Sequence, residues 1–147
     1  MLPSGLMAGA LVAQFAFGLP PCDLCWWQRY PHIAAIGIAA LALALKEEPA
    51  GLPLAALAAL AIATSGLIGA FHAGIEYGLW EGFTSCSSSN LGSDPLASIM
   101  KAPLIRCDTA PWTLMGISMA GFNFLISVSG AILVLTLASR GKGKGIS

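Results

Sequence analysis

Long segments without a charged side chain dominate this sequence. A helix that crosses the hydrocarbon core of a membrane needs roughly 20 mainly apolar residues, because each residue adds about 1.5 Å to its length. Four stretches are candidates: residues 2–19, 26–45, 52–74 and 112–138. Charged residues make up only 10% of the chain, whereas about a quarter is usual in a soluble domain. We therefore expect a single all-α membrane domain, residues 1–147, built as an integral membrane four-helix bundle.

Helix-breaking residues separate the four expected spans. Pro20 and Pro21 end the first span, because proline cannot continue a helix. A short polar turn, residues 46–51, joins the second and third spans, and a long loop over residues 75–111 precedes the fourth. No Lys or Arg precedes the first apolar stretch, so we expect it to be retained as a span and not removed as a signal peptide.

An even number of spans puts both termini on one side of the membrane. That side carries Lys46, Arg140, Lys142 and Lys144, and the other carries Arg29, Lys101 and Arg106. Cytoplasmic segments carry the excess of Lys and Arg, so we expect cytoplasmic termini and an external loop over residues 75–111. Within this loop, the apolar residues of 95–101 share one helical face, which predicts a short interfacial helix. The formal net charge is zero, so no nucleic-acid partner is expected.

All four cysteines fall on the non-cytoplasmic side of this arrangement, and none lies within a span. Disulfides form and persist in oxidising compartments. Cys22 and Cys25 form a C-x-x-C pair at the expected start of the second helix, where the helix dipole favours a thiolate. Cys86 and Cys107 are carried by the long loop. We interpret the four cysteines as two redox-active pairs.

Two other roles for the cysteines stay open. C-x-x-C pairs also bind zinc, but Cys86 and Cys107 are too far apart in sequence to form a second such pair, and we expect no metal. A structural disulfide between Cys86 and Cys107 would close the loop and stabilise the fold by roughly 3 kcal/mol. That role alone would leave the C-x-x-C pair at the helix start unexplained.

Polar residues near the same membrane boundary are candidates for a ligand site. Arg29 lies one turn after Cys25, and His32 continues that face. We expect Arg29 to stabilise the Cys25 thiolate or to bind an electron acceptor; snorkelling to lipid headgroups is the alternative. His72 and Glu76 end the third span, where they either contact a ligand or only terminate the helix. Two polar residues within spans are expected to form interhelical hydrogen bonds: Gln14 and Asn123.

Residues 18–32, GLPPCDLCWWQRYPH, resemble the signature of the DsbB family of disulfide-bond formation membrane proteins. The order of the following segments is similar to that family too: residues 72–76, then Cys86 and Cys107, then residues 111–123. The resemblance covers nearly the whole chain. The first span departs from the family pattern, because it is not preceded by the usual basic residues.

The resemblance implies a protein-dithiol:quinone oxidoreductase of the bacterial inner membrane, with its active cysteines on the periplasmic side. It implies reoxidation of a thioredoxin-like periplasmic partner of the DsbA type, which forms a mixed disulfide with Cys86. Cys107 is then released and exchanges with Cys22. Such an enzyme sustains protein disulfide bond formation.

The resemblance also implies a bound ubiquinone, or menaquinone, as the electron acceptor. Cys25 would face this quinone. Arg29 matches the family arginine that supports quinone reduction, and His72 falls in a region that lines the quinone pocket. The protein then supplies placement and electrostatics, while the quinone accepts the electrons.

Two different classes remain as alternatives. A quinone reductase of the vitamin K epoxide reductase type also combines a four-helix core, a C-x-x-C and loop cysteines. Its C-x-x-C follows the loop pair, whereas Cys22 and Cys25 precede the loop here. A non-enzymatic, metal-binding membrane protein is the other alternative, and the metal content of the purified protein would distinguish it.

Overall fold

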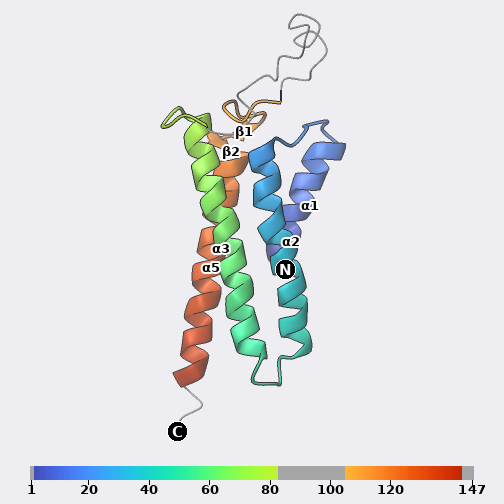
Figure 1. The fold of residues 1–147 in the computed structure, drawn as a ribbon, viewed down its shortest axis with the longest axis vertical. Helices are drawn as coiled ribbons and strands as arrows, with labels where there is room; N and C mark the ends of the chain where they lie inside the picture. The colour runs from blue at the N-terminus through green and yellow to red at the C-terminus, as the bar shows by residue number, and fades with distance from the viewer. Residues whose placement is uncertain (1, 83–104, 144–147) are drawn as a thin grey trace, which may run out of the picture.

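The computed structural model describes residues 2–82 and 105–143 (Figure 1). This part of the chain contains four helices and one short β-hairpin. The helices are α1 (Leu2–Phe15), α2 (Asp23–Ala44), α3 (Gly51–Glu76) and α5 (Met119–Gly143). The hairpin pairs β1 (Thr113–Leu114) with β2 (Ile117–Ser118) in antiparallel register. The predicted interfacial helix over residues 95–101 lies outside the described residues.

Three long helices form the body of the molecule. Helix α3 packs along both α2 and α5, and the shorter α1 leans mainly against α2 (Figure 1). The turn between α2 and α3 lies at one end of this body. The α1–α2 connection and the β-hairpin lie together at the opposite end (Figure 1). The C-x-x-C pair and the segment that carries Cys107 therefore reach the same end of the bundle.

The distribution of polar and apolar side chains is the reverse of that in a soluble bundle. Large apolar residues on α3 and α5 face outward, and Leu60, Leu67 and Leu133 are each more than half exposed. Polar residues occupy the interior instead: Gln28, Arg29, His32, Ser65, His72 and Ser127. Helix α3 and residues 119–140 of α5 are each long and apolar enough to cross a membrane. Both features are typical of a chain that spans a membrane.

Small residues let α3 and α5 approach closely. A Cβ atom placed on Gly66 would lie 2.9 Å from Cγ2 of Val128, and one on Gly69 would lie 2.9 Å from the carbonyl oxygen of Ala120. Close packing of small residues is a main source of helix association in lipid, where no hydrophobic effect draws helices together. Helix α3 is thus packed against α5 on one side, while its last turn faces α2 on the other.

The first and fourth helices differ in extent from the sequence-based expectation. Helix α1 ends at Phe15 and not at residue 19, because Gly18 adopts a left-handed conformation with φ of 65° ahead of the two prolines. Its 14 residues span about 21 Å, less than a bilayer core. Helix α5 begins at Met119 and not at residue 112, because Met115 and Gly116 both have positive φ and form a two-residue hairpin turn.

Candidate functional site

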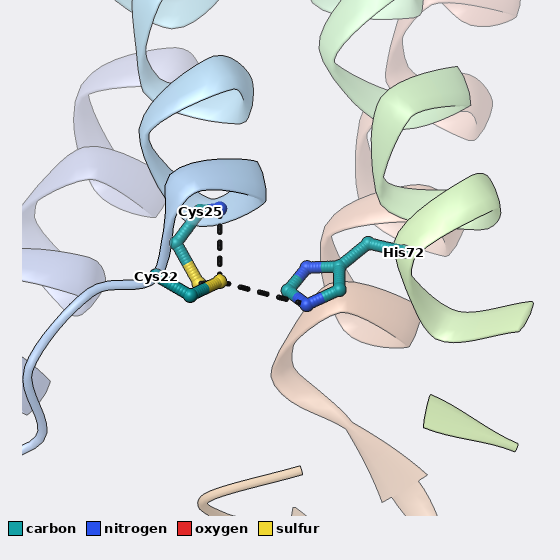
Figure 2. Close-up of side chains that lie close together, drawn as sticks. All are labelled: Cys22, Cys25 and His72. Carbon is teal, nitrogen blue, oxygen red and sulfur yellow. Dashed lines mark hydrogen bonds between the residues drawn. The ribbon is translucent and has the colours of Figure 1, made fainter. Parts of the chain in front are cut away.

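Cys22 and Cys25 lie in direct contact at the N-terminus of α2 (Figure 2). Cys22 is the N-cap residue, in an extended conformation, and its sulfur accepts a hydrogen bond of 3.2 Å from the backbone nitrogen of Cys25. Pro20 and Pro21 precede it and keep the chain out of the helix until this point. The local sequence thus places one cysteine at the cap and the other in the first turn.

The two sulfurs are close enough for reversible disulfide formation. Their Sγ atoms lie 2.8 Å apart and both cysteines are free, whereas a disulfide bond is about 2.05 Å long. Donation of its S–H to the Cys25 sulfur, together with burial, raises the pKa of the Cys22 thiol. Cys25 accepts this hydrogen bond and is therefore the sulfur of the pair whose negative charge is stabilised.

The last turn of α3 brings a histidine and a carboxylate to this thiol pair. His72 Nε2 lies 3.6 Å from Cys22 Sγ (Figure 2). Glu76 lies one turn later, with its Oε1 3.7 Å from the same nitrogen, and both side chains are almost fully buried. Glu76 Oε2 has no hydrogen-bond partner among the described residues. These contacts exceed what merely ending a span requires, because both polar side chains point into the bundle.

Cys107 packs next to the C-x-x-C pair. It is buried in one apolar cluster with Cys22, Leu24 and Ile75, and it is disulfide-bonded. Its backbone is hydrogen-bonded to the ring of His72. A segment that is 82 residues further along the chain than Cys25 is thus anchored beside the pair. Cys86, the fourth predicted catalytic cysteine, lies outside the described residues.

An exposed ion pair flanks Cys107. The guanidinium Nε of Arg106 donates to Asp108 Oδ1 over 2.8 Å. The arginine holds the pKa of the Asp108 carboxyl below its ordinary value. Both groups face solvent, so the pair contributes little to the free energy of unfolding.

Arg29, on α2, is bonded to α1. Its Nη1 donates to Gln14 Oε1 over 2.6 Å, and its Nη2 donates to the carbonyl of Ala10 over 3.4 Å. The guanidinium also lies 4.9 Å from the ring centroid of Trp26, within the range of a cation–π interaction. The prediction that Gln14 bonds between helices is confirmed. Arg29 is thus held against α1, one turn after Cys25 on α2, whereas His72 contacts Cys22 from α3.

A buried polar network joins α2, α3 and α5 beneath the site. His72 Nδ1 lies 2.9 Å from Gln28 Nε2, and Gln28 Oε1 accepts a bond of 2.8 Å from Asn123. Asn123 Oδ1 in turn lies 2.9 Å from His32 Nε2. The interhelical role predicted for Asn123 is confirmed. Sequence reasoning missed Gln28 and Ser65; the available signal was that Gln28 lies three residues after Cys25, on the same stripe of α2.

A metal site at the thiol pair is the main structural alternative. The ligand atoms of Cys22, Cys25 and His72 all lie within 4.8 Å of one another. Two thiolates on tetrahedral zinc are about 3.8 Å apart at Zn–S distances of about 2.3 Å, wider than the 2.8 Å found here. A metal-bound histidine usually donates from its other ring nitrogen, whereas His72 Nδ1 faces the amide nitrogen of Gln28. The arrangement fits a dithiol better than a metal ligand set.

The fold and the site define a class: helical membrane proteins that hold a C-x-x-C dithiol beside a further, oxidised cysteine. The chain belongs to the DsbB family, because the family described as "Disulfide bond formation protein DsbB" matches residues 1–137. It is thus a disulfide bond formation protein of the membrane. This agrees with the resemblance noted from the sequence.

Individual relatives support the same assignment. A disulfide bond formation protein B of Verminephrobacter eiseniae is 31% identical, over 92% of this chain and 80% of the relative. Another protein of that name, from Methylococcus capsulatus, is 34% identical over 79% of this chain and 75% of the relative. A third, from an Acidovorax species, is 29% identical over 95% of this chain and 87% of the relative. No solved structure gives a significant match.

Proposed function

We propose that this protein reoxidises a periplasmic thioredoxin-like dithiol protein of the DsbA type and passes the electrons to a membrane quinone. The observation that carries the proposal is that a reduced cysteine pair and an oxidised cysteine lie together in one site. The free thiols of Cys22 and Cys25 lie in the same buried cluster as disulfide-bonded Cys107. Exchange between a dithiol and a disulfide needs this proximity, because it proceeds by attack of a thiolate on a sulfur.

The proposed reaction has two stages. A thiolate of the partner attacks Cys86, breaks its bond to Cys107 and leaves Cys107 as a thiolate. Cys107 then attacks the Cys22–Cys25 disulfide at Cys22, and Cys25 leaves as a thiolate. The partner's second thiolate resolves its mixed disulfide with Cys86, and Cys86 displaces Cys22 from Cys107. The partner is now oxidised, and the two electrons reside on the Cys22–Cys25 dithiol.

The residues around Cys25 fit a quinone as the acceptor of these electrons. When bound, the quinone supplies a two-electron, two-proton sink, so that one dithiol and one quinone give one disulfide and one quinol. Arg29 would hold a quinone oxygen, because a guanidinium has five N–H donors and only two of its nitrogens bond α1. Cys25 is less buried than Cys22. His72 would act through its contact with Cys22.

The proposal includes an orientation in the bacterial inner membrane. All four helices would cross or enter the bilayer, with both termini in the cytoplasm and the cysteines at the periplasmic face. Helix α2 has 22 residues, or about 33 Å, enough to span. Its polar residues Gln28, Arg29 and His32 are buried against the other helices, so they face the bundle and not the lipid.

Turnover of the purified protein tests the proposal. We expect reduced partner and ubiquinone to give oxidised partner and ubiquinol, measured by the absorbance change of the quinone; menaquinone is assayed in parallel. Cys25→Ser is expected to abolish quinone reduction, because the serine oxygen cannot form the disulfide. Unchanged turnover in Cys25→Ser would reject the mechanism. Stoichiometric zinc in the purified wild-type protein would instead favour a metal-binding protein.

A further inference from the structure

The buried network below Cys22 has one consistent direction of hydrogen bonding. It starts from the backbone carbonyl of Ser65, which can only accept. Asn123 Nδ2 lies 3.2 Å from this oxygen, so this end of the amide is the NH₂ group and the other end is the oxygen. The remaining contacts agree, because Ser127 Oγ and His32 Nε2 lie 2.8 Å and 2.9 Å from Asn123 Oδ1. Asn123 therefore has a fixed orientation.

The orientation of Gln28 follows from that of Asn123. Asn123 Nδ2 donates to Gln28 Oε1 over 2.8 Å, and Gln28 Nε2 donates to the carbonyl of Leu24 over 3.2 Å. The same Gln28 nitrogen lies 2.9 Å from His72 Nδ1. Because a donor faces it, Nδ1 must accept and carries no proton. Neutral His72 then holds its single proton on Nε2.

The protonated nitrogen of His72 faces the redox site. Its neighbours are Cys22 Sγ at 3.6 Å and Glu76 Oε1 at 3.7 Å, and the backbone of Cys107 also bonds the ring. All three can accept a hydrogen bond. A nitrogen that already carries its proton cannot remove one from a thiol, but it can stabilise a thiolate.

We propose that Gln28 and Asn123 are positioning residues that hold His72 as its Nε2–H tautomer, so that His72 donates to the Cys22 sulfur and does not act as its base. This deepens the proposed function and rests on it. The Cys22–Cys25 disulfide closes when the two electrons of the dithiol pass to the quinone of the proposed function, which leaves as quinol with two protons. The Cys22 sulfur forms its bond to Cys25 as a thiolate, and a hydrogen bond from His72 stabilises that charge. The contact of Cys22 with His72 is drawn in Figure 2.

The tautomer can be observed directly. The chain has two histidines, so protein labelled with ¹⁵N in its imidazole rings gives two sets of resonances, which His32→Gln assigns. We expect the Nε2–H tautomer for His72 in the wild type and a mixture of tautomers in Gln28→Met. Ser127→Ala, which removes a contact of Asn123 but not the anchoring carbonyl, should keep the wild-type tautomer. An Nδ1–H tautomer in the wild type would overturn the proposal.

The effect on sulfur chemistry is measured in a Cys25→Ala background, where Cys22 is the remaining thiol of the pair. Besides Cys22, the ionisable group facing His72 in the described chain is then Glu76, which no variant changes. We expect the pH profile of Cys22 alkylation by iodoacetamide to move to higher pH in Gln28→Met, with alkylation roughly tenfold slower at neutral pH. Ser127→Ala should match its parent.

A misfolded variant would not be mistaken for a positive result, for two reasons. Circular dichroism of Gln28→Met must show the helix content of its parent, and the wild-type tautomer needs no variant at all. An unmoved alkylation profile in folded Gln28→Met would refute control of Cys22 by the network. Neither measurement uses quinone or partner protein. A failure of quinone turnover would therefore leave the tautomer result standing, and the two hypotheses can be separated.

Discussion

The structure bears on the two roles considered for Arg29, snorkelling to lipid headgroups and a function near the thiol pair. Snorkelling needs a guanidinium that reaches the headgroups, but this one is 7% exposed and lies beside the ring of Trp26. Its bond to Gln14 also fixes its direction. Burial of a cation near a membrane is costly, so these contacts argue against snorkelling, and the proposed role in quinone use stays a prediction.

Replacing Arg29 should affect quinone use more than thiol exchange. We expect Arg29→Ala to raise the KM for ubiquinone by roughly tenfold or more, because a charge-assisted hydrogen bond is lost. Exchange with the reduced partner, measured without quinone, should change far less. Arg29→Lys keeps the charge but not the planar donor geometry and should be intermediate. Equal losses in both half-reactions would argue against the assigned role.

The site residues that are related by spacing within one helix could be predicted from the sequence, and those that meet only across helices could not. Cys22, Cys25 and Arg29 follow one another at intervals of about one helical turn, so α2 alone places them on one face. Gln28 was not predictable as a functional residue, because its partners Asn123 and His72 come from other helices. Which side chains meet across a bundle depends on how each helix is rotated, and the sequence pattern of an apolar span does not define that rotation.

At the scale of elements, the close contact between α3 and α5 is expected to contribute to the stability of the bundle. Gly66→Val would add atoms where even a Cβ lies 2.9 Å from Val128. We expect a loss of about 1–3 kcal/mol in the free energy of unfolding. Gly37→Ala in α2 is the matched control, because a Cβ there meets nothing within 4 Å. Chemical denaturation of the purified protein in detergent would measure both.

Gly37→Ala should be neutral or slightly stabilising, because alanine is favoured over glycine within a helix. A Gly66→Val protein as stable as the wild type would mean that α3 and α5 are not packed this closely. The sequence predicted helices here from charge-free length, yet the hairpin before α5 was missed, because residues 112–118 carry no charge and run directly into the span that follows.

At the scale of the whole molecule, the chain is organised as an inverted bundle with its chemistry at one end. The thiol pair, the last turn of α3 and the segment with Cys107 meet at the end opposite the α2–α3 turn (Figure 1). A dithiol at the membrane boundary can meet a water-soluble partner on one side and a lipid-soluble acceptor on the other. A protein with a fully polar surface could not meet the lipid-soluble acceptor, and a site in the middle of the bundle could not meet the water-soluble partner.

The proposed orientation predicts which ends of the bundle are accessible from outside the cell membrane. Two exposed positions at opposite ends, Thr109 and Glu48, are suited to single-cysteine labelling in a variant whose four native cysteines are replaced by serine. We expect a membrane-impermeant maleimide to label Thr109→Cys in intact spheroplasts, because this end faces the periplasm. Glu48→Cys should react only after the membrane is permeabilised. Labelling of Glu48→Cys in intact spheroplasts, with Thr109→Cys protected, would show that the topology is the opposite of the proposed one. The dithiol would then lie in the reducing cytoplasm, where it could not oxidise a periplasmic partner.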